Sequence, residues 1–324
     1  MKTNISLIGL VASAAILFTG CSDDEKMPDF PGNPNPIVFT GDNSATFKIT
    51  QTPVSTIQTV EWSIGVKSNK APKSDVRVTM GIDNSLIAAY NAEHKTNYQA
   101  VPAGVVVFEN QVMTIPAGER ESVEETKMKL TEDSELLASL NSTDGYLVPV
   151  TVTGVEGAQL AVSRSSVSYI ALPIVFDNVQ QGVGIEAATG TAVNDHTGWF
   201  CNTNIEGFDA STFVDGDPAT YTTSYNSDIE LVVDMGREYN FDAIEACYQE
   251  PWGQKLIRGS LSEGTDISIS SDSKSWVTVG TVKSGTFKYG TQFVVLYAPI
   301  KARYIRLNIP NKFQCGSINI YETK

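Results

Sequence analysis

Apolar and polar residues alternate in short runs from about residue 37 onward, which is typical of β-strands that bury one face. The clearest run is 76–82, where Val76, Val78, Met80 and Ile82 occupy alternate positions. Turn signals such as Pro116-Ala117-Gly118 separate the runs. Further runs lie at 61–66, 105–108, 112–115, 146–153 and 169–175. The pattern predicts an all-β domain over residues 37–176.

One helical segment interrupts this domain. Asp83 can accept a hydrogen bond from the first helical turn, and Ile82 and Ile87 have the spacing of a hydrophobic staple. His94 and Lys95 would lie near the C-terminal end, where cations suit the helix dipole. We therefore expect an immunoglobulin-like β-sandwich with one short helix.

The alternation returns after residue 195. Ile229, Leu231, Val233 and Met235 share one face, and the same spacing recurs at 267–269, 305–309 and 318–320. No convincing helix separates these runs, so antiparallel sheets in a second sandwich over residues 196–324 are predicted. Residues 177–195 have no clear period and are rich in Gly, Gln, Ala and Thr, which indicates a linker.

The N-terminal segment has the features of a signal peptide. Lys2 precedes an apolar run of about 14 residues, which is too short to span a bilayer. The run ends in Leu17-Phe18-Thr19-Gly20-Cys21, which resembles a bacterial lipobox with Cys21 as the lipidated residue. We therefore expect a signal peptide at 1–20 and a lipid anchor. The alternative is an ordinary secretory signal with an incidental cysteine.

Residues 21–36 follow as a tether. Ser22-Asp23-Asp24-Glu25 resembles the acidic export signal that certain Gram-negative gut anaerobes use to send lipoproteins to the outer face of the outer membrane. The alternative is an acidic, solvated linker. Residues 27–36 contain four prolines and cannot join a packed core. The expected location is the outer membrane, facing outward.

Composition narrows the ligand class. The formal net charge of −14 lacks the basic footprint that nucleic-acid binding requires, so we expect no nucleic-acid partner. Besides Cys21, the chain has Cys201, Cys247 and Cys315 without C-x-x-C spacing, which argues against a zinc site. An odd number of remaining cysteines in an oxidising compartment allows one disulfide and one buried thiol.

Catalytic motifs are missing from the sequence. Only His94 and His196 occur, and neither an H-E-x-x-H helix nor a G-x-S-x-G elbow is present. The two sandwiches account for the chain and leave no room for a catalytic barrel. We predict that the protein is not an enzyme; a glycoside hydrolase using paired carboxylates is the alternative.

Several motifs of the first domain occur together in the order of a known family. They resemble domain-of-unknown-function family 1735, and the resemblance covers residues 37–176. Members of that family occur at the N-termini of surface lipoproteins, some of which carry endoglycosidase domains that act on N-glycans. The motifs are Ala89-Tyr90-Asn91, Thr96-Asn97-Tyr98, Val101-Pro102, 114–119 and 146–150.

Landmarks of the second domain resemble the discoidin-like, coagulation factor 5/8 C-type family. That family is a jelly-roll sandwich and includes the family-32 carbohydrate-binding modules. The resemblance implies that Trp276 fills the core and that Arg303 and Arg306 brace strands. The landmarks are Trp199-Phe200-Cys201, 214–221, 233–236, 271–276, 302–307 and 318–321.

The resemblance implies a ligand site on loops at one end of this sandwich. Sugars stack their C–H faces on aromatic rings and need planar hydrogen-bonding partners, which Trp252, Gln254 and Arg258 supply in one loop. Trp252 could instead plug the loop, and Arg258 could pair with a glutamate. Further candidates, for which a purely structural role is also open, are His196, Tyr225, Asn226, Phe313 and Gln314.

Two structural features follow from the same resemblance. Asp215, Asp217 and Thr220 match the family's calcium loop, whose ion would brace the fold, and no catalytic cofactor is expected. Ser317 occupies the place of the family's last calcium-binding glutamate, and an Asp-Gly turn is the alternative. The resemblance also implies a disulfide between Cys201 and Cys315.

The sequence therefore predicts a non-catalytic surface lipoprotein that captures a glycan. Its expected partners are an outer-membrane transporter and glycoside hydrolases of a polysaccharide-utilisation system. The association of the first family with endoglycosidases makes a host N-glycan the first ligand to test. The alternative is an adhesin or structural surface module that feeds no uptake.

Overall fold

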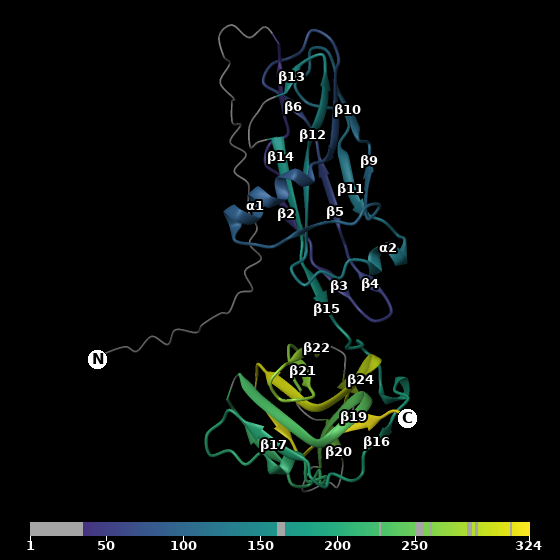
Figure 1. The fold of residues 1–324 in the computed structure, drawn as a ribbon, viewed down its shortest axis with the longest axis vertical. Helices are drawn as coiled ribbons and strands as arrows, with labels where there is room; N and C mark the ends of the chain where they lie inside the picture. The colour runs from purple at the N-terminus through teal and green to yellow at the C-terminus, as the bar shows by residue number, and fades with distance from the viewer. Residues whose placement is uncertain are drawn as a thin grey trace, which may run out of the picture.

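The computed structural model describes residues 35–160, 166–226, 228–249, 256–258, 261–283, 287–288, 291–311 and 313–324. Two β-rich domains follow one another along the chain, and each has its own buried core. Figure 1 shows the N-terminal domain above and the C-terminal domain below. The predicted all-β fold with two sandwiches is confirmed.

The named elements among the described residues of the N-terminal domain are short strands and short helices. The strands are β1 (Ile37–Phe39), β2 (Ala45–Thr46), β3 (Ile49–Gln51), β4 (Thr56–Ile57), β5 (Glu61–Ile64), β6 (Lys67–Ser68), β7 (Val76–Ile82), β8 (Gln99–Ala100), β9 (Val106–Glu109), β10 (Val112–Ile115), β11 (Thr126–Leu130), β12 (Tyr146–Glu156), β13 (Gln159–Leu160), β14 (Val167–Leu172) and β15 (Ile174–Phe176). The helices are η1 (Asn84–Leu86), α1 (Ile87–His94) and α2 (Ser134–Ala138).

The main sheet of this domain has the order β10-β7-β12-β14-β2, and a second sheet has the order β5-β11-β9. Alternation decides which side chains face the core: Val76, Val78 and Met80 of β7 are buried. On the second sheet, Trp62 and Met128 are paired across β5 and β11, and both are buried in the same core.

The expected helix is present, but its start differs from the prediction. The Asp83 carboxylate accepts a hydrogen bond from the Ser85 backbone amide and thus caps η1 rather than α1. α1 packs on the outer face of the main sheet through Ile87, which meets Leu147 and Ala171. The sequence analysis did not predict α2, a single turn capped by the side chain of Asp133.

The C-terminal domain is built on two long strands with shorter ones beside them. Its strands are β16 (Thr191–Ala192), β17 (Phe200–Thr203), β18 (Thr222–Ser224), β19 (Ile229–Gln249), β20 (Leu256–Arg258), β21 (Asp266–Ser270), β22 (Val277–Thr281), β23 (Phe287–Lys288), β24 (Thr291–Ile309), β25 (Phe313–Cys315) and β26 (Ser317–Glu322). Two short 3-10 helices, η3 (Ile185–Ala187) and η4 (Ser211–Phe213), complete it.

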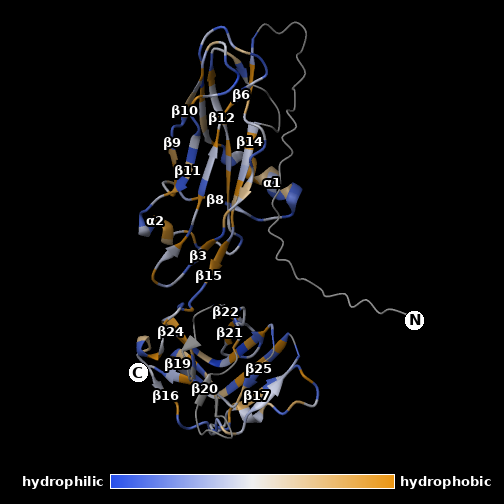
Figure 2. Ribbon diagram, turned by 180° about the vertical axis from the view of Figure 1, so that it is seen from behind, coloured by the Kyte–Doolittle hydropathy of each residue, from blue (hydrophilic) through white to orange (hydrophobic). Residues whose placement is uncertain are grey.

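β19 and β24 run antiparallel and bend together, so that they contribute to both layers of the sandwich (Figure 1). Hydrophobic and hydrophilic bands alternate along strands of this domain (Figure 2). The strand order is β16-β26-β19-β24-β21-β22, and the predicted antiparallel pairing is confirmed. The bend of β19 lies between Asp234 and Tyr239, where the pairing register shifts. At this bend, Arg303 of β24 donates hydrogen bonds of 2.8 and 2.9 Å to the two oxygens of the Asp234 carboxylate. These hydrogen bonds lower the pKa of Asp234.

The role expected for Arg303 as a strand brace is confirmed, but the role of Trp276 was wrong. Trp276 is partly exposed beyond the core, and the Arg306 guanidinium carbon lies 4.4 Å from the centre of one of its rings. Trp276 immediately precedes β22, the last strand in the sheet order, so it lies at the edge of the sheet. This pair therefore stabilises the outer surface of the sheet.

The segment expected as a linker begins as a joint packed on both domains. The Asp177 amide donates to Gln51 O of β3, and the Asn178 amide donates to Val279 O of β22. The Asn178 side chain also brackets Ala298, with hydrogen bonds of 2.8 Å to its carbonyl and 2.9 Å from its amide. Val179 is fully buried in the C-terminal core. The two sandwiches are therefore joined by backbone pairing rather than by a free tether.

The joint lies at one end of the N-terminal domain, and the described chain begins at the other. β14 leads into β15 and the joint, whereas β1 pairs with β13 and β6 at the far end (Figure 1). Among the described residues, no helix is long and apolar enough to cross a membrane. The N-terminal sandwich thus separates residue 35 from the C-terminal domain by its full length.

We predict that Asn178→Ala loosens the joint. The substitution leaves the Ala298 amide and carbonyl without their partners, at a cost of about 1–3 kcal/mol in unfolding free energy. Small-angle X-ray scattering should show a broader distribution of interdomain distances than in the wild type. Asn204→Ala is a matched control, because the Asn204 amide brackets backbone inside the C-terminal domain. Identical scattering from the wild type and both variants would contradict the prediction.

Candidate functional site

The predicted ligand site lies at the end of the C-terminal sandwich where β19 finishes and β26 begins. Cys247 of β19 pairs with Arg258 of β20 on one side and with Ser317 of β26 on the other. β25 continues back from β26 and pairs with β18, where Thr223 lies opposite Gln314. The backbone pairing thus gathers β18, β20 and β25 at one end, as expected.

Two exposed tyrosines stand on this end. Tyr225 directly follows β18 and is 80% exposed, and Tyr221 directly precedes β18 and is 37% exposed. Tyr221 and Tyr225 flank β18 at positions of the same parity as Thr223, which is partly exposed, whereas Ser224 is buried. Gln314 lies beside them across the strand pair and is partly exposed. The arrangement offers aromatic, hydroxyl and amide groups on one surface.

Tyr221 is the residue that the sequence analysis did not select. The motif containing it was interpreted as a structural landmark, although the spacing Tyr221-x-Thr223-x-Tyr225 has the period of a strand face. Asn226, which was selected, is exposed on the same loop, and its backbone amide donates to Ser224 Oγ at 3.2 Å.

The prediction that Phe313 contacts the ligand was wrong. Phe313 is fully buried, and its ring packs edge-on against Phe213 with centroids 5.2 Å apart. The reason is the alternation of β25, which turns Phe313 and Cys315 inward and Gln314 outward. Phe313 therefore holds β25 on the core, and this positions Gln314.

His196 packs within the domain instead of standing on the exposed surface of β18. Its ring stacks on Trp199 with centroids 4.3 Å apart. Nε2 lies 3.1 Å from Asn319 Oδ1 and 3.2 Å from Val193 O. These contacts connect the segment before β17 to β26, and the structure does not bring His196 together with Tyr225.

Three predicted residues lie outside the described residues: Trp252, Gln254 and Cys21. Arg258 is described through its backbone position in β20, opposite Cys247. The roles predicted for these four residues stay predictions.

The Asp215–Thr220 loop forms a tight polar turn. Asp215 Oδ1 accepts from the Asp217 amide at 2.8 Å, and Thr220 Oγ1 donates to Asp215 Oδ2 at 2.5 Å and to Asp217 O at 2.9 Å. Gly216 has a φ of +78°, which allows the turn. Within the described ranges, no group of three or more His, Cys, Asp or Glu side chains could hold a metal ion. The oxygen atoms of this loop come from two carboxylates, one hydroxyl and the backbone.

The predicted disulfide between Cys201 and Cys315 is not formed, because all three described cysteines are free and buried. β17 places Cys201 opposite Val233 of β19, whereas β25 pairs with β18, so the two cysteines are not on neighbouring strands. The Cys315 thiol donates instead to Ser317 O at 3.1 Å. Burial raises the pKa of Cys201 and of Cys247 to about 12 and also raises that of Cys315, so all three stay protonated at neutral pH.

Two family models match the chain, one for each domain. Residues 33–159 match the model of an N-terminal domain family, and residues 192–322 match the F5/8 type C domain. The expected combination of an N-terminal family domain with a discoidin-like domain is confirmed. No curated protein matches this chain.

Solved structures with the same fold include both domains together. A two-domain protein of unknown function from Bacteroides fragilis is 18% identical, with a TM-score of 0.57, and the match covers 89% of this chain and 95% of that protein. The family 32 carbohydrate-binding module of NanJ from Clostridium perfringens, solved with galactose, is 19% identical over 41% of this chain and 98% of the module, with a TM-score of 0.33.

Proposed function

We propose that the C-terminal sandwich binds a glycan through the surface formed by Tyr221, Thr223, Tyr225 and Gln314. The observation that carries the proposal is a pair of exposed tyrosines beside an amide, on a domain of the discoidin-like family. Exposed aromatic side chains supply apolar faces for sugar C–H groups, and phenol and amide groups exchange hydrogen bonds with sugar hydroxyls. Arg258 approaches the same end from β20.

The proposed role is binding rather than catalysis. A discoidin-like domain suggests carbohydrate binding, and rigid sandwiches present ligand-binding groups on the loops at their ends. The proposed surface contains aromatic, hydroxyl and amide groups, which stack on and hydrogen-bond to a sugar. A non-catalytic module of this kind concentrates substrate for other proteins.

The proposal includes a position on the cell surface. A lipid on Cys21 and a proline-containing tether would attach the chain at the far end of the N-terminal sandwich, because β1 lies there. The N-terminal sandwich then acts as a spacer, and the joint at Asn178 fixes the direction of the C-terminal domain. We propose that an outer-membrane transporter and glycoside hydrolases receive the captured glycan.

The proposal also includes a structural calcium ion on the Asp215–Thr220 loop. Calcium prefers oxygen ligands, and the two carboxylates, Thr220 Oγ1 and backbone carbonyls of this loop are of that kind. The loop packs on the start of β26, because a Cβ atom on Gly316 would lie 2.4 Å from Pro218 O. Such an ion would hold the loop against that strand and would supply no chemistry to the ligand.

Glycan binding should depend on Tyr225. We predict that a printed array of animal N-glycans, O-glycans and plant oligosaccharides identifies at least one ligand for the full chain. Calorimetry with a galactose-terminated biantennary N-glycan, the first candidate, should show at least a ten-fold loss of affinity at the tyrosine surface in Tyr225→Ala, which equals about 1.4 kcal/mol. Phe200→Ala is the control, because Phe200 is 55% exposed on β17 of the same domain. Adhesion of cells to a protein ligand without any glycan binding would favour the adhesin function instead.

Calcium removal should destabilise the C-terminal domain. At a calcium concentration 100-fold above the dissociation constant, binding adds about 2.7 kcal/mol, so a chelator should lower the Tm. Asp217→Asn should remove the response to the chelator. Asp209→Asn should keep it, because the Asp209 carboxylate makes a similar turn contact to Ser211 outside the loop. A Tm that does not respond to chelator or calcium would refute the ion.

The surface location should be visible in intact cells. Protease added to whole cells is expected to remove the protein, and Cys21→Ala should abolish labelling with a radioactive fatty acid. Inner-leaflet lipoproteins of the same cells serve as the control for membrane integrity. Complete protection of the wild-type protein would show that the acidic residues 23–25 are only part of a linker.

A further inference from the structure

A groove of about 580 Å³ lies at the bend of β19, away from the surface just described. Its lining includes Asp195, Thr197, Arg237, Tyr239 and Glu322. Glu322 pairs with Phe241 at one end of β26, whereas Ser317, at the other end, pairs with Cys247 beside β20. The six residues of β26 span about 17 Å, so the groove and the Tyr225 surface belong to opposite ends of the sandwich.

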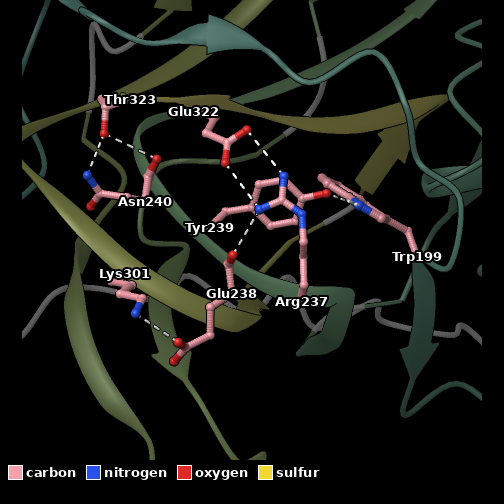
Figure 3. A network of polar contacts seen from close by, with 8 residues as sticks. All are labelled: Trp199, Arg237, Glu238, Tyr239, Asn240, Lys301, Glu322 and Thr323. Carbon is pink, nitrogen blue, oxygen red and sulfur yellow. Dashed lines mark hydrogen bonds and ion pairs between the residues drawn. The ribbon is translucent and has the colours of Figure 1, made fainter.

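Arg237 is held flat on one wall of the groove. Its guanidinium carbon lies 3.7 Å from the centre of the Tyr239 ring, which is buried, and its two terminal nitrogens donate to the two Glu322 carboxylate oxygens at 3.2 and 3.4 Å (Figure 3). A further hydrogen bond of 3.1 Å reaches Glu238 O. These contacts take three of the five N–H donors of a guanidinium, and the side chain is still 59% exposed. The group is therefore fixed in orientation and accessible.

The floor of the groove is bare backbone. Gly198 and Gly236 both have positive φ, of 83° and 76°, and a Cβ atom on Gly236 would lie 3.0 Å from Gly198 O. A Cβ atom on Gly198 would meet nothing within 4 Å, so this glycine faces open space. Two glycine turns packed together thus leave this part of the groove without side chains, which lets a ligand approach the main chain closely.

The polar lining disfavours an anionic ligand. Arg237 is paired with Glu322, and the lining also includes Asp195, whose carboxylate accepts from the Thr197 amide at 2.9 Å. Thr191 and Thr197 add hydroxyls. A pocket of this volume accommodates a small ligand, and a planar guanidinium with neighbouring carboxylate and hydroxyl groups matches the adjacent hydroxyls of a sugar ring.

Other contacts drawn in Figure 3 are separate from the groove. Lys301 pairs with Glu238 at 3.0 Å, and the Asn240 side chain donates to Thr323 Oγ1 at 2.6 Å. Neither Lys301 nor Asn240 lines the groove. These pairs tie β19 to β24 and to the chain end after β26, so changing them tests the strand pairing without changing the groove.

We propose that this groove is a second saccharide site, which takes an uncharged sugar unit of the same glycan class. The proposal rests on the glycan-binding function of the domain. Arg237 and Asp195 would hold hydroxyls of the sugar over the Gly198–Gly236 floor. Two sites at opposite ends would let one protein engage two branches or two chains, which raises the avidity for a dense glycan surface.

Calorimetry on the full chain tests the proposal with the galactose-terminated biantennary N-glycan, which is uncharged. The wild type should bind two glycan molecules per chain. Thr197→Trp, which fills the groove, and Tyr225→Ala should each reduce this to one, and the double variant should bind none. Arg237→Lys keeps the charge but loses the planar fork, and it should weaken the groove site at least ten-fold. Lys301→Gln is the matched control and should behave as the wild type.

The outcomes separate the two ideas. A wild-type stoichiometry of one that persists in Thr197→Trp and disappears in Tyr225→Ala overturns the groove and leaves the proposed function intact. A stoichiometry of one that persists in Tyr225→Ala and disappears in Thr197→Trp supports the groove and removes the tyrosine surface. No binding by any of the proteins overturns both. Unchanged Tm values in all variants confirm that the fold is preserved.

Discussion

The antiparallel pairing of β19 with β24 is the interaction on which the C-terminal domain depends. The two strands are paired from Ile229 to Ala246, through a bend that carries them from one layer of the sandwich to the other. A bend interrupts the ladder and would leave the sheet free to slip by one register, which would turn every buried side chain outward. The Arg303–Asp234 contact across the bend opposes this slip, and the bidentate geometry makes it directional. Leu231 before the bend and Phe241 after it are buried in the same core.

The same pairing determines where ligands can be offered. β26 and β20 both pair with the second half of β19, which begins at the bend and finishes beside β20. The two ends of this half-strand therefore lie at the two ends of the domain. At one end the short pair β18–β25 holds Tyr225 and Gln314 outward because Phe313 anchors it from inside. At the bend the chain cannot carry side chains on its inner corner, since Gly236 meets Gly198 there. A hollow at the bend is therefore a consequence of how the strand turns.

The sequence was sufficient for the fold because alternation records burial directly. Val76, Val78 and Met80 in one domain and Leu231, Val233 and Met235 in the other are buried as the period of two requires. Alternation does not show where a short strand begins and ends, or whether its residues face a ligand surface or the core. Phe313 was therefore assigned to the ligand although its parity on β25 turns it inward, and Tyr221 was passed over although it shares the face of Tyr225.

Features that depend on distant partners were the least predictable. The sequence of the joint, Asp177–Val179, shows no periodic pattern of apolar residues. Its backbone hydrogen bonds go to β3 and β22, which are distant in the sequence. Composition alone made it look like a linker. Likewise, cysteine spacing says nothing about which strands are adjacent, and the thiols of Cys201 and Cys315 lie on strands with different partners. Of the predicted site residues, Tyr225, Asn226 and Gln314 lie together on and beside the β18–β25 pair, and their role in ligand binding stays a prediction.

A paired joint matters for the proposed glycan binding for mechanical reasons. A free linker would let the C-terminal domain sample many orientations, so each binding event would lose that freedom and part of the binding free energy. The Asn178 bracket and the buried Val179 remove this freedom before the ligand arrives. A joint paired to both domains thus holds the C-terminal domain in one direction relative to the N-terminal sandwich. If both ends of the C-terminal domain bind sugar as proposed, the joint presents both sites in a fixed geometry.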